Sequence, residues 1–310
     1  MIISASRRTD IPAFYSEWFF NRLNEGYALV PNPYNADRLG RVELSPKNVD
    51  CIVFWTKNAE PMLDKFLKLD EMGYPYCVHF TMTPYGRDIE KGLPPKPILM
   101  ETFRKMSERI GAERSVWRYD PVIVDAEHPV GWHLERFGEM CGRLRDHTER
   151  CFISFVDPYK SLEKRFRGLT DDETAGIASG FSEIAGTNGI ELFTCAEGAD
   201  LSRYGIGHGA CIDQKLIERI IGHRITAKKD ANQRNECNCI ESVDIGAYST
   251  CPHGCSYCYA VSGRETMMRR VAAHDPNSPM ITGHPRGGEL ITDRTAPSLK
   301  NKQTDLSHFK

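Results

Sequence analysis

Short apolar runs alternate with longer amphipathic segments along most of the chain. The apolar runs have the length of strands, and the segments between them have helical periodicity. We expect strands at residues 2–5, 51–56, 76–83, 115–119, 151–156, 190–194 and 242–248, with a small hairpin arm near 40–44. We expect helices at 61–72, 97–110, 132–144, 172–185 and 213–221, a first helix opened by Pro12, and a last helix from about residue 256.

The predicted strands are mostly apolar and show no regular alternation between apolar and polar residues. Such strands are buried on both faces, which is typical of a parallel sheet covered by helices. The pattern therefore predicts an α/β fold, a partial or near-complete (β/α) barrel of about six to seven parallel strands, over residues 1–274. Residues 275–310 are polar and lack periodicity, so we expect a loosely packed flap or a disordered end.

The charge balance narrows the classes of partner. The 310 residues carry 40 basic and 42 acidic side chains, a net charge of −2. This balance argues against a general nucleic-acid or anionic-membrane surface. We see no apolar run long enough to span a bilayer and no signal-peptide pattern after Met1. Eleven cysteines in such a chain favour metal ligation in a reducing cytoplasm over a disulfide framework.

The densest group of cysteines follows the last predicted strand. Cys251, Cys255 and Cys258 have C-x3-C-x2-C spacing within residues 250–260. Three thiolates on one loop can hold three irons of a [4Fe–4S] cluster, and the fourth iron is then open to the amino and carboxylate groups of S-adenosylmethionine (SAM). A zinc site and three free thiols are the alternatives, although zinc motifs normally add a second cysteine pair or a histidine.

Four more cysteines lie in the segment 195–240, between the last two predicted strands. This segment can bring them together near the top of the barrel, where we prefer a second [4Fe–4S] cluster held by protein thiolates alone. Structural zinc is one alternative, and packed thiols, one of them a possible hydrogen-atom donor, are another. The four residues are Cys195, Cys211, Cys237 and Cys239. We expect Cys51, Cys77, Cys141 and Cys151 to be ordinary buried thiols.

Polar side chains follow the predicted strands at their carboxyl ends, where the chemistry of parallel α/β barrels gathers. Hydroxyl, carboxylate and cationic groups there can bind the ribose, carboxylate and amino groups of SAM. Taken singly, each is equally a candidate helix cap or loop salt bridge. The cofactor candidates are Ser6, Arg8, Thr9, Asp10, Lys57, Thr81 and Thr83, and the catalytic or substrate candidates are Arg118 and Asp120. Asp157, Tyr159 and Glu197 continue the series.

From Met1 to about Arg269 the chain resembles an uncharacterised bacterial and archaeal family that is known as a domain of unknown function and grouped as radical-SAM-like. The resemblance is carried by residues 4–12, 54–58, 118–121, 195, 209–213 and 237–260. Thr9-Asp10, Thr56-Lys57 and the Arg-Tyr-Asp-Pro segment 118–121 are also similar to motifs of the spore photoproduct lyase branch of the radical-SAM superfamily. These resemblances imply that Thr9 and Asp10 contact the amino end of SAM and that Tyr257 lies beside its adenine.

Superfamily members normally carry the cysteine motif after the first strand, whereas here it follows the last. We therefore expect a circular permutation, in which strand 242–248 takes the first barrel position and strand 2–5 the second. The two strands would then be adjacent and parallel, and the loop 6–10 would lie beside the cysteine loop.

Together these features predict a radical SAM enzyme that reductively cleaves SAM to a 5′-deoxyadenosyl radical and acts on an unknown substrate. Its cofactors would be a [4Fe–4S] cluster, SAM and a second [4Fe–4S] cluster or zinc. Its partner would be a low-potential electron donor such as a flavodoxin or ferredoxin. The alternatives are a non-catalytic iron–sulfur or zinc sensing module and a nucleic-acid repair enzyme of the lyase type.

Overall fold

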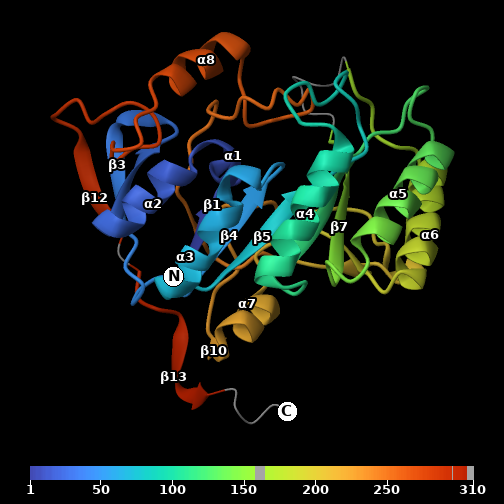
Figure 1. The fold of residues 1–310 in the computed structure, drawn as a ribbon, viewed down its shortest axis with the longest axis horizontal. Helices are drawn as coiled ribbons and strands as arrows, with labels where there is room; N and C mark the ends of the chain where they lie inside the picture. Colours follow the sequence, from blue (N-terminus) through green and yellow to red (C-terminus); the bar gives the residue numbers. More distant parts are fainter. Residues whose placement is uncertain (158–164, 295, 306–310) are drawn as a thin grey trace.

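An eight-stranded, all-parallel sheet forms the centre of the computed structural model, which describes residues 1–157, 165–294 and 296–305 (Figure 1). In spatial order the strands are β11 (Val243–Asp244), β1 (Ile2–Ala5), β4 (Cys51–Thr56), β5 (Tyr76–Thr81), β6 (Ser115–Val122), β7 (Arg150–Phe155), β8 (Glu191–Thr194) and β9 (Gly207–His208). The predicted parallel α/β sheet is confirmed, with one strand more than expected. Within the described residues β9 and β11 are edge strands that do not pair with each other, so hydrogen bonds between strands do not close the sheet into a barrel there.

The first and last strands of the predicted set are neighbours, as expected. Ile3 lies opposite Val243 in a parallel pair, and the other edge of β1 pairs with β4. The last strand is shorter than predicted: of residues 242–248, only Val243 and Asp244 are in strand conformation.

The carboxylate of Asp244 joins β11 to β1 and to the loop that follows it. It accepts hydrogen bonds from the hydroxyls of Ser4 at 2.6 Å and Ser6 at 2.8 Å, and from the backbone N–H of Arg7 at 2.9 Å. The backbone N–H of Gly246 donates to the same carboxylate at 3.0 Å. A side chain on the edge strand therefore fixes the direction in which both loops leave the sheet.

One face of the sheet is covered by helices, which Figure 1 shows along β4 to β7. They are α3 (Phe66–Glu71), preceded by the 3-10 helix η1 (Glu60–Lys65), and α4 (Lys96–Ile110), α5 (Val130–Leu144) and α6 (Asp171–Thr187). Alternate strand residues such as Phe54 and Val78 pack with apolar helix residues such as Phe103 and Phe181 in one buried cluster. These helices match the predicted ones closely because their apolar residues recur with helical period.

The other face of the sheet is covered by the segment 209–240, which includes α7 (Gln214–Ile221). Residues of opposite parity on the strands, such as Val53 and Val116, pack there against Ile212 and Leu216. Since strand side chains point alternately to the two faces, this division follows directly from the strand assignments. Three cysteines of the second set belong to the same buried cluster, namely Cys211, Cys237 and Cys239.

The remaining elements flank the sheet. They are α1 (Ile11–Phe14), α2 (Ser16–Glu25), β2 (Tyr27–Asn32), β3 (Asn35–Glu43), η2 (Ser202–Tyr204), β10 (His223–Ile225), α8 (Arg264–Ala272), β12 (Leu290–Arg294) and β13 (Lys300–Asp305). The predicted hairpin arm is the longer pair β2–β3. The helix expected from residue 256 begins only at Arg264, because residues 251–262 form turns. In the described part of the chain no helix is long and apolar enough to cross a membrane.

The C-terminal segment makes more contact with the rest of the chain than a loose flap would make. β12 pairs with β3, and β13 pairs with β10. The indole of Trp18 donates to the carbonyl of Ser278 at 2.9 Å, and Ile281 is buried in the main core. These contacts were not predicted because the segment has a polar composition and no periodicity.

Replacing Asp244 by Ala should lower the free energy of unfolding by about 2–4 kcal/mol, because several buried donors lose their acceptor. Denaturant unfolding measures this, with Asp293→Ala on the exposed strand β12 as the control, expected within about 0.5 kcal/mol of wild type. Equal stability of the two variants would contradict the role assigned to Asp244.

Candidate functional site

The cysteine loop, residues 250–260, follows β11 and lies against the loop that follows β1. Nε2 of His253 lies 2.8 Å from the carboxylate of Asp10, and the hydroxyl of Tyr259 donates to the carbonyl of Arg7 at 3.2 Å. The predicted contact between the loop 6–10 and the cysteine loop is therefore confirmed. Both loops leave the sheet at the carboxyl ends of parallel strands, the edge at which we expected the chemistry.

Asp10 connects three of the loops at this edge. One carboxylate oxygen accepts the backbone N–H of Ala13 at 3.0 Å and so caps α1. The other accepts the backbone N–H of Lys57 at 2.7 Å and faces His253. Its side chain is therefore engaged within the protein, as the helix-cap alternative predicted, and its contact with SAM stays a prediction.

Cys251, Cys255 and Cys258 are partly buried. Burial raises the pKa of all three thiols, that of Cys255 to about 12. Backbone N–H groups of the loop donate to the sulfurs of Cys251 and Cys258, which opposes this effect. At neutral pH the thiols would therefore lose their protons only to a bound cation, which is the usual condition for metal ligation by cysteine.

The buried carboxylate of Glu90 holds the cysteine loop from the segment after β5. It accepts hydrogen bonds from Lys57 Nζ at 2.7 Å, from the hydroxyl of Thr83 at 2.9 Å, and from the hydroxyl of Tyr257 and the ammonium of Lys96. Burial alone would raise its pKa, but the two lysines lower the pKa to about 2. Glu90 is therefore an ionised, fully buried anchor for Tyr257.

The same segment also holds the cysteine loop through its backbone. The N–H of Gly92 donates to the carbonyl of His253 at 2.7 Å, and the N–H of Ser256 donates to the carbonyl of Ile89 at 2.9 Å. A Cβ on Gly92 would lie 2.7 Å from the His253 carbonyl oxygen, so a side chain there would push the loop away. We did not predict Glu90 or Gly92. The only sequence signal is a connection of residues 84–95 that is rich in Pro and Gly.

Arg118 and Asp120, the two catalytic candidates, form an ion pair on β6. Asp120 also accepts a hydrogen bond from the hydroxyl of Ser154 on β7. The guanidinium of Arg118 donates to the sulfur of Cys211 at 2.7 Å. The structure thus brings the two candidates together, and it places Arg118 between the polar edge of the sheet and the second cysteine set.

The other cofactor candidates divide into two groups. Ser6 donates to Asp244, and Arg8 lies 3.9 Å from the same carboxylate, so both contribute to the scaffold. The hydroxyl of Thr9 is buried and has no hydrogen-bond partner among the described residues, and Thr81 ends β5 with a partly exposed side chain. Tyr159 lies outside the described residues.

Three of the four cysteines of the second set form a close group, and this group lies against the sheet face that the segment 209–240 covers. The sulfurs of Cys195, Cys211 and Cys239 all lie within 4.8 Å of one another, with Cys195 and Cys239 4.0 Å apart. Cys237 contacts Cys195 and Cys239. Hydrogen bonds from the other three thiols lower the pKa of Cys239. Such a group could hold a metal ion or cluster.

Glu197 follows β8 at the same edge of the sheet. Its carboxylate accepts the backbone N–H of Phe155 at 2.8 Å. Burial, with smaller contributions from the charges of Asp120 and Asp157, raises its pKa to about 7. Glu197 can therefore gain or lose a proton near neutral pH.

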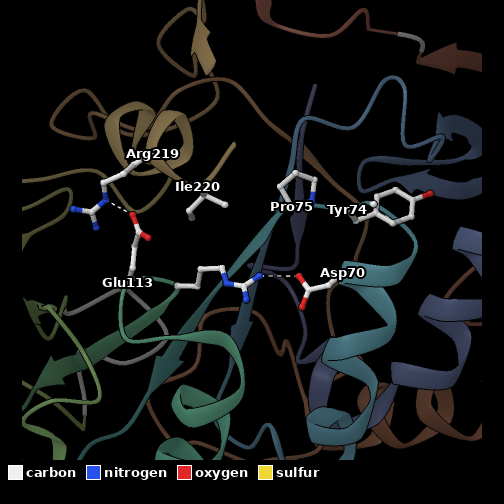
Figure 2. A pocket seen from close by; sticks show the side chains of 8 residues that line it. Asp70, Tyr74, Pro75, Glu113, Arg219 and Ile220 are labelled. Atoms are coloured by element: carbon white, nitrogen blue, oxygen red, sulfur yellow. Dashed lines mark hydrogen bonds and ion pairs between the residues drawn. The ribbon is translucent and has the colours of Figure 1, made fainter. Parts of the chain in front are cut away.

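A hollow of about 380 Å³ lies at the opposite, amino edge of the sheet. Figure 2 shows its lining, where Arg219 of α7 pairs with Glu113, and Arg114 pairs with Asp70 at 2.8 Å. These residues adjoin the beginnings of β5 and β6, where residues of parallel α/β folds serve stability. We therefore place the candidate site at the carboxyl edge and regard the hollow as structural.

Fold and site together define an α/β protein with an all-parallel sheet and a converged cysteine group that could bind a metal ion or cluster. The chain belongs to the family described as a domain of unknown function (DUF1848), whose model matches residues 2–260. That range includes the whole parallel sheet and both cysteine sets. A search of curated proteins gives no match to the chain.

Glu90→Gln should destabilise the protein by about 3–5 kcal/mol, because two largely buried ammonium groups lose their counter-ion. The pKa of Glu90 is lowered to about 2 from 4.5. The difference in free energy of unfolding between wild type and variant should therefore be largest above pH 4.5 and should shrink as the pH falls toward 2. Unfolding at several pH values tests this. Glu101→Gln, in an exposed ion pair on α4, is the matched control and should change little. A pH-independent difference would contradict the ionised anchor.

The stability difference between wild type and Glu197→Gln should change with pH in the opposite direction to that of Glu90→Gln. A carboxyl whose pKa is raised to about 7 contributes stability below its ordinary value of 4.5 and loses it as the pH rises through 7. As the pH rises from 5 to 8, the free energy of unfolding of wild type should therefore fall by about 2 kcal/mol relative to that of the variant. Melting temperatures measured across this pH range test the effect. Glu191→Gln, on the exposed side of β8, is the control, and its melting temperature should change with pH as that of wild type does. Parallel curves for Glu197→Gln would refute the raised pKa.

Proposed function

We propose that the protein is a radical SAM enzyme whose cysteine loop holds a [4Fe–4S] cluster through Cys251, Cys255 and Cys258. The observation that carries the proposal is the position of this C-x3-C-x2-C loop, at the carboxyl edge of a parallel sheet and beside the polar loop 6–10. When bound, cluster and SAM together supply one-electron cleavage of SAM and hydrogen abstraction from a substrate.

The donor set fits a cluster better than a single ion. The loop offers three thiols, one ligand fewer than a closed tetrahedral site requires. Their sulfurs do not form a group within 4.8 Å of one another, although their charges interact. Wider spacing is what separate irons of one cluster require.

Unsatisfied polar groups beside the loop support a bound ligand. The hydroxyls of Thr9 and Ser256 are buried and have no hydrogen-bond partner among the described residues. A buried hydroxyl without a partner is costly, and a ligand or water would satisfy it. Tyr257 is held by Glu90, with Lys57 Nζ 5.4 Å from its ring centre, so its ring has a fixed position beside the cysteine loop, which suits the proposed contact with adenine.

On the substrate side we propose Arg118 and Asp120 as contacts, with Glu197 as a group that can exchange a proton near neutral pH. The side chain of Asp120 is 26% exposed, so a substrate can reach it, while Arg118 and Ser154 keep it oriented. The adjacency of β11 and β1 supports the circular permutation, in which the strand before the cysteine loop takes the first position.

The proposed electron donor is a low-potential acidic protein such as a flavodoxin or ferredoxin. The helix α8, which follows the cysteine loop, exposes Arg264, Arg269 and Arg270, and a positive surface would attract such a donor. This position would bring the donor close to the proposed cluster.

Cys255→Ser should abolish the iron-dependent absorbance of the air-free reconstituted protein and the formation of 5′-deoxyadenosine from SAM under reductant, because two remaining thiolates hold a cluster poorly. Cys141→Ser, at a buried thiol inside α5, is the control and should retain both signals. A non-catalytic metal module would bind iron but release no 5′-deoxyadenosine in wild type. That result would end the enzyme proposal.

A further inference from the structure

We infer that the second cysteine set is a four-thiolate site for one tetrahedral metal ion, with Zn²⁺ as the ion that its donors favour. The ligands are Cys195, Cys211, Cys237 and Cys239. This differs from the second [4Fe–4S] cluster that we expected from the sequence. It does not depend on the proposed activity of the cysteine loop.

The spacing of the sulfurs distinguishes the two kinds of site. Zn–S bonds are about 2.3 Å long and tetrahedral, so two thiolates on one ion lie about 3.8 Å apart. Cys195 and Cys239 are 4.0 Å apart, and both lie within 4.8 Å of Cys211. In a [4Fe–4S] cluster each thiolate binds a different iron, so the sulfurs are held farther apart.

The fourth ligand comes from Cys237, which forms a C-x-C pair with Cys239. Its side chain is buried and contacts both Cys195 and Cys239, but its sulfur is not among the three that all lie within 4.8 Å of one another, so a bound ion would have to draw it closer. Backbone N–H groups support the sulfurs: Ile212 donates to Cys239 at 3.3 Å, and Cys239 donates to Cys237 at 3.4 Å. Such donors orient metal-bound thiolates, and a site of four thiolates favours zinc among single divalent ions.

The charges around the site suit a zinc tetrathiolate. Four thiolates and one Zn²⁺ leave two negative charges, which need cationic partners when buried. Arg118 donates to Cys211 at 2.7 Å. A second guanidinium, that of Arg7, lies close enough to Cys239 and Cys211 to interact with their charges.

The ion would join the two open sides of the sheet. Cys195 follows β8, Cys211 follows β9, and Cys237 and Cys239 precede β11. Within the described residues no hydrogen bonds connect the edge strands β9 and β11. A metal bound to all four cysteines would fasten the segment 209–240 across the sheet face and would add to the hydrogen bond between Ile240 and Ile212 that links the two edges.

Metal and acid-labile sulfide analysis of the Cys251→Ala/Cys255→Ala/Cys258→Ala variant, purified without air, tests the inference. We expect about one zinc per chain and no sulfide, because only the second set remains. Iron with sulfide in the ratio of a [4Fe–4S] cluster would overturn the single-ion site, and a chain without metal would overturn the site itself. Neither result depends on SAM cleavage, so the proposed activity can fail or succeed separately.

Single substitutions keep the test decisive if the triple variant does not fold. Wild type should contain zinc in addition to any iron, and Cys195→Ser or Cys239→Ser should lose the zinc while Cys77→Ser, at a buried thiol on the same sheet face, retains it. Co²⁺ substituted into wild type should give the absorption of a tetrahedral tetrathiolate, and each ligand variant should weaken it. Zinc content that is unchanged in Cys239→Ser would contradict the ligand set.

Discussion

The parallel pairing of β1 with β11 determines where the cysteine loop lies relative to the polar loops at the carboxyl edge of the sheet. It places a strand from the beginning of the chain beside one from residues 243–244, and Asp244 then ties both to the loop after β1. Because parallel strands end at the same edge, the cysteine loop and the loops after β1 and β4 meet there. Asp10 can link these loops only because that order brings their backbones together.

Much of this arrangement could be predicted from local patterns. Apolar runs marked the strands, and helical periodicity marked α4, α5 and α6. The pairing of β1 with β11 was expected because the cysteine motif follows the last strand and not the first. The pattern of apolar and polar residues alone would not have predicted this pairing. The short strand β9 escaped prediction because two residues carry no period. The predicted start of α8 was too early, because the residues between Cys255 and Arg264 form turns although their composition is compatible with a helix.

The parts of the site that could not be predicted are those that depend on long-range burial. Glu90 is one charged residue among many in the sequence, and its importance appears only when Lys57, Lys96 and Tyr257 surround it. Convergence of the second cysteine set could be predicted, since its members all lie in the one connection, residues 195–240, between the last two predicted strands. Whether such a set suits one metal ion or a cluster could not be predicted, because that depends on the separations between the sulfurs, which spacing along the chain does not fix.

Arg118 connects the two halves of the proposed site. Its guanidinium is always charged, so it cannot respond to its surroundings by losing a proton. It can only divide its hydrogen bonds between Cys211 on one side and Asp120 on the other. A change of charge at the second cysteine set, through metal binding or loss, would therefore alter how firmly Arg118 holds the Asp120 carboxylate. Binding of a metal at the second cysteine set would therefore be physically coupled to the orientation of the polar edge, although the two cysteine sets lie on different loops.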